Sequence, residues 1–208
     1  MFKQLVAFEA YYQLKQRALP IFALIFFLYG FMAGRQNFAP SGVDFNSPYQ
    51  IAYFTSLISL GCVFAIIFFA VSGVLRDAQH KMENMIYSTA LKKHDFFWSR
   101  FSGIFLFSLL AITPFLIGLT TALIATKLDP ERIADFNLWI YLWSWLIIMV
   151  PNVFICSALI FSVSTLTKNS IATYVSAVFI YMLYMIAAIF LNSPLVAQST
   201  PASPEAMI

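Results

Sequence analysis

The chain has 208 residues, of which 61% are hydrophobic and only 10% are charged. Soluble globular domains are about 45–50% apolar and about 25% charged, and disordered chains combine low hydrophobicity with high charge. The composition therefore excludes both classes and favours membrane-spanning helices, which need about 20 apolar residues each. The net charge of +3 is too small to indicate a nucleic-acid-binding face, so nucleic acid is not an expected partner.

The N-terminal segment, residues 1–18, is predicted to be an amphipathic helix that lies in the membrane interface. Its large apolar residues fall roughly on one side and are Leu5, Phe8, Tyr12 and Leu14. The polar residues available to lipid headgroups are Lys3, Gln13, Lys15 and Arg17. A frayed tail is the alternative interpretation of this segment.

Five long stretches without charge follow, and each is predicted to be a membrane-spanning helix. A charge at the bilayer centre costs about 2.5–3.5 kcal/mol on insertion scales, whereas a helix satisfies its own backbone groups in lipid. The expected fold class is therefore an all-α polytopic membrane protein, with a transmembrane domain over residues 19–191. The predicted spans are residues 19–34, 51–75, 101–126, 138–165 and 171–191.

Basic residues are divided unequally between the connecting segments. With the N-terminus inside, nine of the twelve Lys and Arg residues lie in inner segments, and the outer segments keep Arg35, Lys127 and Arg132. The positive-inside rule therefore predicts that the N-terminus and residues 76–100 are cytoplasmic. An interfacial aromatic belt is expected at the outer end of the fourth span, formed by Trp139, Tyr141, Trp143 and Trp145.

The inner segment, residues 76–100, is the most informative part of the chain. Met82, Met85 and Ile86 occur at i, i+3 and i+4, and this spacing predicts a short amphipathic helix that lies across the membrane surface. Asp95 follows a polar break and is expected to cap the next helix.

The same segment carries a series of residue types in a distinctive order. The series begins with a glutamate (Glu83) and an aliphatic residue (Ile86), and continues with the stretch Ser88-Thr89-Ala90-Leu91. It ends with a basic residue (Lys93), an aromatic residue (Phe96) and a final cation (Arg100). This order resembles the pattern G-T-x-E-x-L-x-x-T-P-V-S-R-x-x-Y-L-x-G-K between the second and third helices of ABC-2-type transporter permeases. The chain departs from the pattern where Gly-Thr, Pro and Gly are replaced by His80-Lys81, Ala90 and Ser99. With the N-terminal helix in front, the resemblance covers nearly the whole chain in helix order.

The resemblance implies a permease subunit of an ATP-driven exporter in a bacterial cytoplasmic membrane. Two permease units, identical or different, would form the pathway, and a partner ABC ATPase subunit would bind ATP and Mg. The family has six spans in each unit, so the five predicted here imply an N-terminal portion of a longer chain. Residues 192–208 would then begin an outer loop, and their Ser/Pro/Ala-rich sequence is similar to a bacterial branch in which the permease is fused to an M1-type aminopeptidase.

Two sets of site residues follow. The resemblance assigns the contact with the ATPase to Lys81, Glu83, Asn84, Tyr87, Ser88, Thr89 and Leu91. Within the spans, Asn152 follows Pro151, which is expected to kink its helix and to free a backbone carbonyl. A kink with local repair is one interpretation, and the other is a polar lining of the substrate pathway by Asn152, Ser157 and Ser162.

Catalytic motifs are absent from the sequence. It contains no G-x-x-x-x-G-K-[ST] and no H-E-x-x-H, so it encodes neither a P-loop nor this type of zinc peptidase. The predicted spans carry no ionisable Asp, Glu, Lys, Arg or His. We therefore expect no catalytic residue, no metal site and no cofactor in this chain. A non-ABC polytopic scaffold or secretion component is the alternative function.

Small residues four apart are expected to let helices approach closely inside the bundle. These pairs are Gly30/Gly34, Gly118/Ala122 and Ala172/Ser176.

Overall fold

A computed structural model of the chain describes residues 2–35, 43–76, 92–125 and 132–190, and these residues form helices without any β-strand among them. Five of the helical stretches are long and apolar enough to cross a membrane, as the charge distribution predicts. The stretches are α2 (Ala18–Arg35), α3 (Pro48–Val74), α6 with α7 (Lys93–Ile112 and Pro114–Ala125), α8 with the π-helix η2 and α9 (Leu138–Ser144, Trp145–Met149 and Val150–Thr167), and α10 (Ser170–Phe190).

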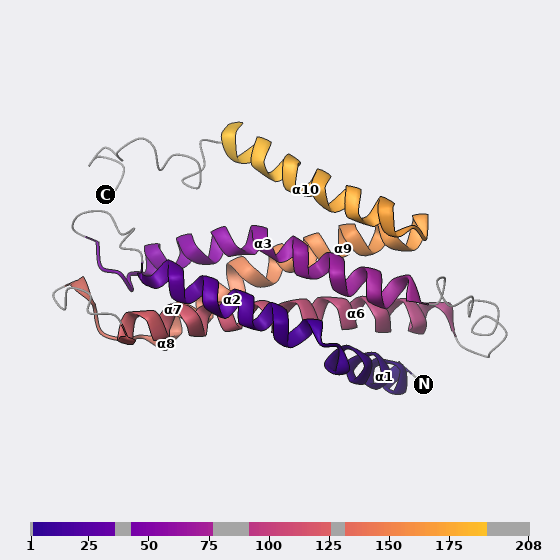
Figure 1. Cartoon of the computed structure of the whole chain (residues 1–208), viewed down its shortest axis with the longest axis horizontal. Coiled ribbons are helices and arrows are strands. Elements are labelled where there is room, and N and C mark those ends of the chain that lie inside the picture. The colour runs from indigo at the N-terminus through magenta and orange to yellow at the C-terminus, as the bar shows by residue number, and fades with distance from the viewer. Residues whose placement is uncertain (1, 36–42, 77–91, 126–131, 191–208) are drawn as a thin grey trace.

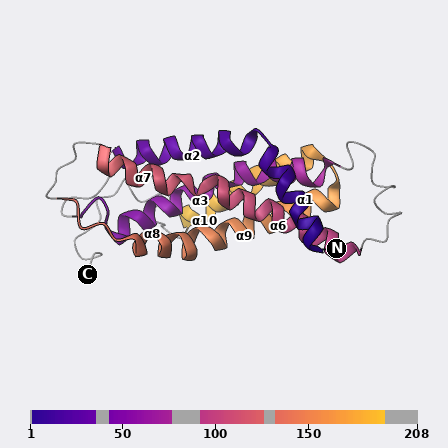
Figure 2. The same ribbon diagram turned by 90° about the horizontal axis from the view of Figure 1, so that it is seen from below.

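Successive stretches run in opposite directions along an elongated bundle (Figure 1). The N-terminal helix α1 (Phe2–Lys15) lies at one end of it, where α3 ends and α6 begins, and crosses the bundle obliquely (Figure 2). We call this the α1 end and the opposite one, where α8 begins, the α8 end. Helix α3 occupies the centre and is buried along much of its length, whereas α10 packs on α3 and α9 and exposes most of its large side chains.

The predicted spans agree with the helices to within a few residues except at the start of the third. That helix begins at Lys93 and not near residue 101, because a helix can extend its polar end beyond an apolar core without placing charge inside it. Lys92 is the N-cap residue and Asp95 lies in the first turn, so the expectation that Asp95 caps the helix is wrong. A carboxylate in the first turn still interacts favourably with the helix dipole.

Helices α2 and α7 form the closest helix pair through two of the small-residue pairs. A Cβ atom added at Gly34 would lie 2.6 Å from the Ala122 Cβ, and one added at Gly118 would clash with the Phe27 carbonyl oxygen. Side chains at these positions would separate the two helices. The predicted internal packing of Gly30/Gly34 and Gly118/Ala122 is therefore confirmed.

The fourth stretch contains a π-helical turn, η2, directly before Pro151. Here the Val150 N–H donates to the Trp145 carbonyl, five residues earlier, in place of the usual four. Proline has no N–H to offer the preceding turn, and a single wide turn is a common way to accommodate such an interruption in a helix. The disturbance expected at Pro151 thus takes the form of a wide turn.

At the α8 end, two connections are joined by hydrogen bonds. The Asn46 side chain donates to the Ala134 carbonyl over 2.5 Å and accepts from the Ala134 N–H over 2.8 Å. The Phe45 N–H donates to the Arg132 carbonyl, and the Arg132 guanidinium donates to the Val43 carbonyl. This loop clamp, formed by residues 43–46 and 132–134, fastens the start of α3 to the start of α8.

Candidate functional site

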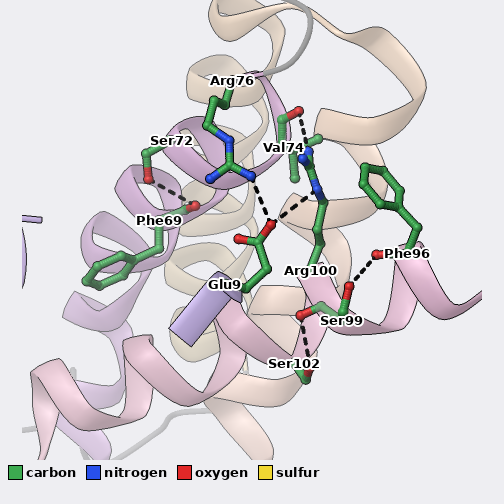
Figure 3. Close-up of polar contacts among 9 residues, drawn as sticks. All are labelled: Glu9, Phe69, Ser72, Val74, Arg76, Phe96, Ser99, Arg100 and Ser102. Carbon is green, nitrogen blue, oxygen red and sulfur yellow. Dashed lines mark hydrogen bonds and ion pairs between the residues drawn. The ribbon is translucent and has the colours of Figure 1, made fainter. Parts of the chain in front are cut away.

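Three charged side chains from three helical segments meet at the α1 end, inside the bundle (Figure 3). Glu9 of α1 is only 5% exposed, and its carboxylate lies between two guanidinium groups. The Arg76 Nη2 atom, just beyond the end of α3, is 3.0 Å from Glu9 Oε1, and the Arg100 Nε atom of α6 is 3.6 Å from the same oxygen. We call these residues the Glu9 cluster.

Aromatic rings and a helix terminus surround the arginines of the Glu9 cluster. The Arg76 guanidinium lies 4.2 Å from the centre of the Tyr12 ring, and that of Arg100 lies 4.4 Å from the centre of the Phe96 ring. Arg100 also donates to the Val74 carbonyl over 3.1 Å, which satisfies an acceptor in the last turn of α3 (Figure 3). A guanidinium close to a ring face is attracted by the negative charge of that face, and here this attraction adds to the ion pairs.

The buried face of α1 is polar, and one residue of this helix, Gln13, does not lie where the prediction placed it. Gln13, expected to meet lipid headgroups, is 0% exposed and packs beside Gly73 of α3, whereas the rings of Phe8 and Tyr11 are more than half exposed. Neither polar side-chain atom of Gln13 has a hydrogen-bond partner among the described residues. The helix therefore attaches to the bundle through Glu9 and its neighbours and turns its aromatic side outward.

The Glu9 cluster holds together both ends of the segment predicted to meet an ATPase. Arg76 is the last described residue before it and Lys92 the first described residue after it. The seven predicted contact residues, Lys81, Glu83, Asn84, Tyr87, Ser88, Thr89 and Leu91, lie outside the described residues. The cluster therefore joins α1 to the end of α3 and to the first turns of α6, on the two sides of that segment.

The three residues of the predicted pathway lining do not share one surface. Asn152 points to α3, where its Nδ2 atom donates to the Ser59 hydroxyl over 2.9 Å. Ser157 is buried, and its hydroxyl has no partner among the described residues, whereas Ser162 is exposed and donates to the Ala158 carbonyl within its own helix. Residues five apart on a helix point in different directions, and of these three side chains only Asn152 makes a hydrogen bond to another span among the described residues.

Asn152 and Ser59 lie in a groove of about 290 Å³ between α3, α9 and α10. Tyr184 of α10 completes the polar part of the lining, and aliphatic side chains supply most of the rest. No charged residue lines this groove. We call it the Asn152 groove.

The aromatic belt predicted at the start of the fourth span divides between two sides of the helix. Trp139 and Trp143 are exposed and stack with ring centres 5.8 Å apart. Tyr141 is buried in the core, and Trp145 is partly buried against it. Only two of the four rings therefore face outward, because residues two apart on a helix point to nearly opposite sides.

Sequence analysis did not single out Glu9, Ser59 or Tyr184. The signal for Glu9 was present, because it is the only acidic residue among the first 43. A lone acid among bases on an amphipathic helix is a candidate for an internal ion pair. Ser59 and Tyr184 gave no such signal, since isolated hydroxyl residues are ordinary in apolar helices.

Potential metal ligands do not cluster in the part of the chain that the structure describes: no three His, Cys, Asp or Glu side chains come together there. No protein-family model, no curated protein and no solved structure matches this chain.

Proposed function

We propose that this chain is the membrane-spanning permease subunit of an ATP-driven ABC-2-type transporter. It would lie in a bacterial cytoplasmic membrane with its α1 end in the cytoplasm and would export its substrate. A partner ABC ATPase would bind ATP and Mg, and a second permease unit, identical or different, would complete the pathway. The chain itself would carry no catalytic residue.

The Glu9 cluster is the observation that supports this proposal most. Arg76 precedes the ABC-2-like residue order, Arg100 is its final cation, and the carboxylate between them comes from the N-terminal helix. A transporter driven by an ATPase needs a firm connection between the surface that the ATPase moves and the membrane spans. Buried ion pairs among α1, the end of α3 and the start of α6 meet that need.

The outer surface of the bundle supports the membrane part of the proposal. Large apolar side chains are exposed on α2, α9 and α10, as on Leu28, Phe154 and Phe179. Such a continuous apolar surface is rare on soluble monomers and is suited to lipid. The exposed Trp139 and Trp143 rings at the α8 end lie where an interfacial aromatic pair is expected.

A paired substitution in the predicted contact segment tests the proposal. The sequence spacing of Glu83, Asn84, Tyr87 and Leu91 predicts that they share one stripe of a helix, so Glu83→Arg combined with Tyr87→Ala is expected to disrupt an ATPase contact. Loss of single interface anchors costs about 2 kcal/mol or more, enough to weaken association more than tenfold. The measurements are co-purification of a P-loop ATPase with the tagged chain and stimulation of its ATP hydrolysis.

Lys92→Glu is the matched control, because it reverses one charge, in the opposite direction, at an exposed position outside the predicted stripe. It is expected to preserve both association and stimulation, and both variants are expected to insert into the membrane normally. Unchanged association in the double variant, or absence of any ATPase partner, would contradict the proposal and favour a scaffold or secretion component.

A further inference from the structure

We infer that the Asn152 groove is a binding site for an uncharged molecule with a single alkyl chain and a hydroxyl or amide group. The inference uses only the membrane location from the proposed function. It does not depend on the ATPase partner.

The polar side of the groove has unused hydrogen-bonding capacity. Asn152 donates to Ser59, and Ser59 in turn donates to the Ser56 carbonyl over 2.6 Å, so these two bonds fix the amide in place. The Asn152 Oδ1 atom and the Tyr184 hydroxyl have no hydrogen bond to any residue that the structure describes. The groove therefore presents an acceptor and a hydroxyl that a ligand can pair with.

The remainder of the lining favours an alkyl chain. Leu60 and Val63 of α3, Leu159 of α9, and Ile180 of α10 are aliphatic, and the absence of a lining charge disfavours an ionised ligand. A charge placed among apolar groups without a partner loses its hydration and gains nothing in return. An apolar pocket with a few placed polar groups is the usual form of a small-molecule site.

The dimensions and the opening of the groove specify the ligand further. Its volume of about 290 Å³ is at the lower limit of small-molecule pockets, about 300–1,000 Å³, so it suits one chain better than a two-chain lipid. Ile155 and Leu183 at its edge are 56% and 50% exposed on the outer surface of the bundle. A ligand dissolved in the membrane can therefore enter from the side.

Photolabelling of the purified full chain in detergent tests this site. The probe is hexadecanol carrying a diazirine on its chain, with unlabelled hexadecanol as competitor and hexadecanoate as the charged comparison. We expect saturable labelling of α9 and α10 peptides that hexadecanol suppresses and that hexadecanoate, at pH 8, suppresses at least about fivefold less effectively, since a carboxylate finds no cation in the groove.

Two variants and one control make the result specific. Asn152→Leu keeps the volume but removes the amide, and it is expected to reduce labelling about fivefold, as loss of one hydrogen bond would. Leu183→Trp fills the groove from α10 without touching that hydrogen bond and is expected to reduce labelling as strongly. Ser162→Ala, on the exposed side of α9, should leave the labelling unchanged.

Three results would overturn the inference. They are labelling that does not saturate, labelling that spreads evenly over all exposed helices, and equal labelling of the parent chain, Asn152→Leu and Leu183→Trp. A cross-link between two copies of the chain through position 183 would also overturn it, because a second copy would then cover the groove. ATPase association is not measured in this experiment, so a negative result here and a failure of the proposed function remain distinguishable.

Discussion

Glu9 shows how one buried charge can fix the position of a whole helix. Burying a carboxylate costs several kcal/mol unless it is paired, and removal of one partner leaves the others buried without compensation. Two guanidinium groups, from Arg76 and Arg100, meet one oxygen atom of Glu9. The orientation of α1 therefore depends on this residue more than on its aromatic side chains, which are largely exposed.

Replacement of Glu9 is expected to destabilise the bundle at the α1 end. Glu9→Gln keeps the size of the side chain but removes its charge, and we expect it to lower the free energy of unfolding by about 3–5 kcal/mol. The measurement is thermal unfolding of the purified chain in detergent. Lys3→Gln removes one charge from an exposed position of the same helix and should change stability by less than about 0.5 kcal/mol. Equal melting temperatures for the two variants would contradict a stabilising role of the cluster.

Among the helices, the pairing of α2 with α7 depends on the absence of side chains at their contact. A methyl group at Gly118 would clash with the Phe27 carbonyl oxygen, and backbone cannot move aside as a flexible side chain can. The same methyl group at Gly61, on α3, would find its nearest neighbour at 3.7 Å, an ordinary contact distance. Two glycines in similar apolar helices should therefore respond to alanine in opposite ways.

Gly118→Ala is expected to lower the free energy of unfolding by about 1–3 kcal/mol through overpacking. Gly61→Ala is expected to be neutral or to stabilise by up to about 1 kcal/mol, because alanine favours the helix over glycine. Denaturant titration followed by circular dichroism measures both. A stabilising effect at position 118 would show that α2 and α7 are not in close contact.

Sequence information predicted the helices well because the cost of burying charge is a local property of the chain. Uncharged stretches therefore mark four of the five spans nearly to their ends. The predicted third helix was too short at its start, because Lys93 and Asp95 are charged and were assigned to the preceding loop. In the structure the helix carries these residues beyond its apolar part.

The contacts at the candidate sites could not be predicted in the same way. Glu9 and Arg100 are 91 positions apart, and Asn152 and Ser59 are 93 apart. Which polar groups meet at such separations depends on how the helices pack. The prediction that Asn152, Ser157 and Ser162 line one pathway rested on their closeness in sequence. In the structure Asn152 bonds to Ser59, Ser157 is buried, and Ser162 is exposed.

For the whole molecule, the proposed orientation places the α1 end in the cytoplasm and the α8 end outside. A cysteine at position 42 should then react with a membrane-impermeant maleimide in intact cells, and one at position 92 should not. The native Cys62 and Cys156 are first replaced by alanine. Permeabilised cells provide the control, since both positions should then react. Labelling of position 92 in sealed cells would reverse the orientation and remove the basis for an ATPase at the α1 end.

The loop clamp at the α8 end implies an order of events during synthesis of the chain. Asn46 and Ala134 are 88 residues apart, and at about 5–20 residues per second a ribosome needs roughly 4–18 s to make the intervening chain. Until then, the Asn46 amide has no partner in the clamp, and α2 with α3 must exist as a hairpin without the support of α8. Closure of this end therefore cannot precede synthesis of the segment before the fourth span, and until that moment the start of α3 is fastened to nothing at the α8 end through Asn46.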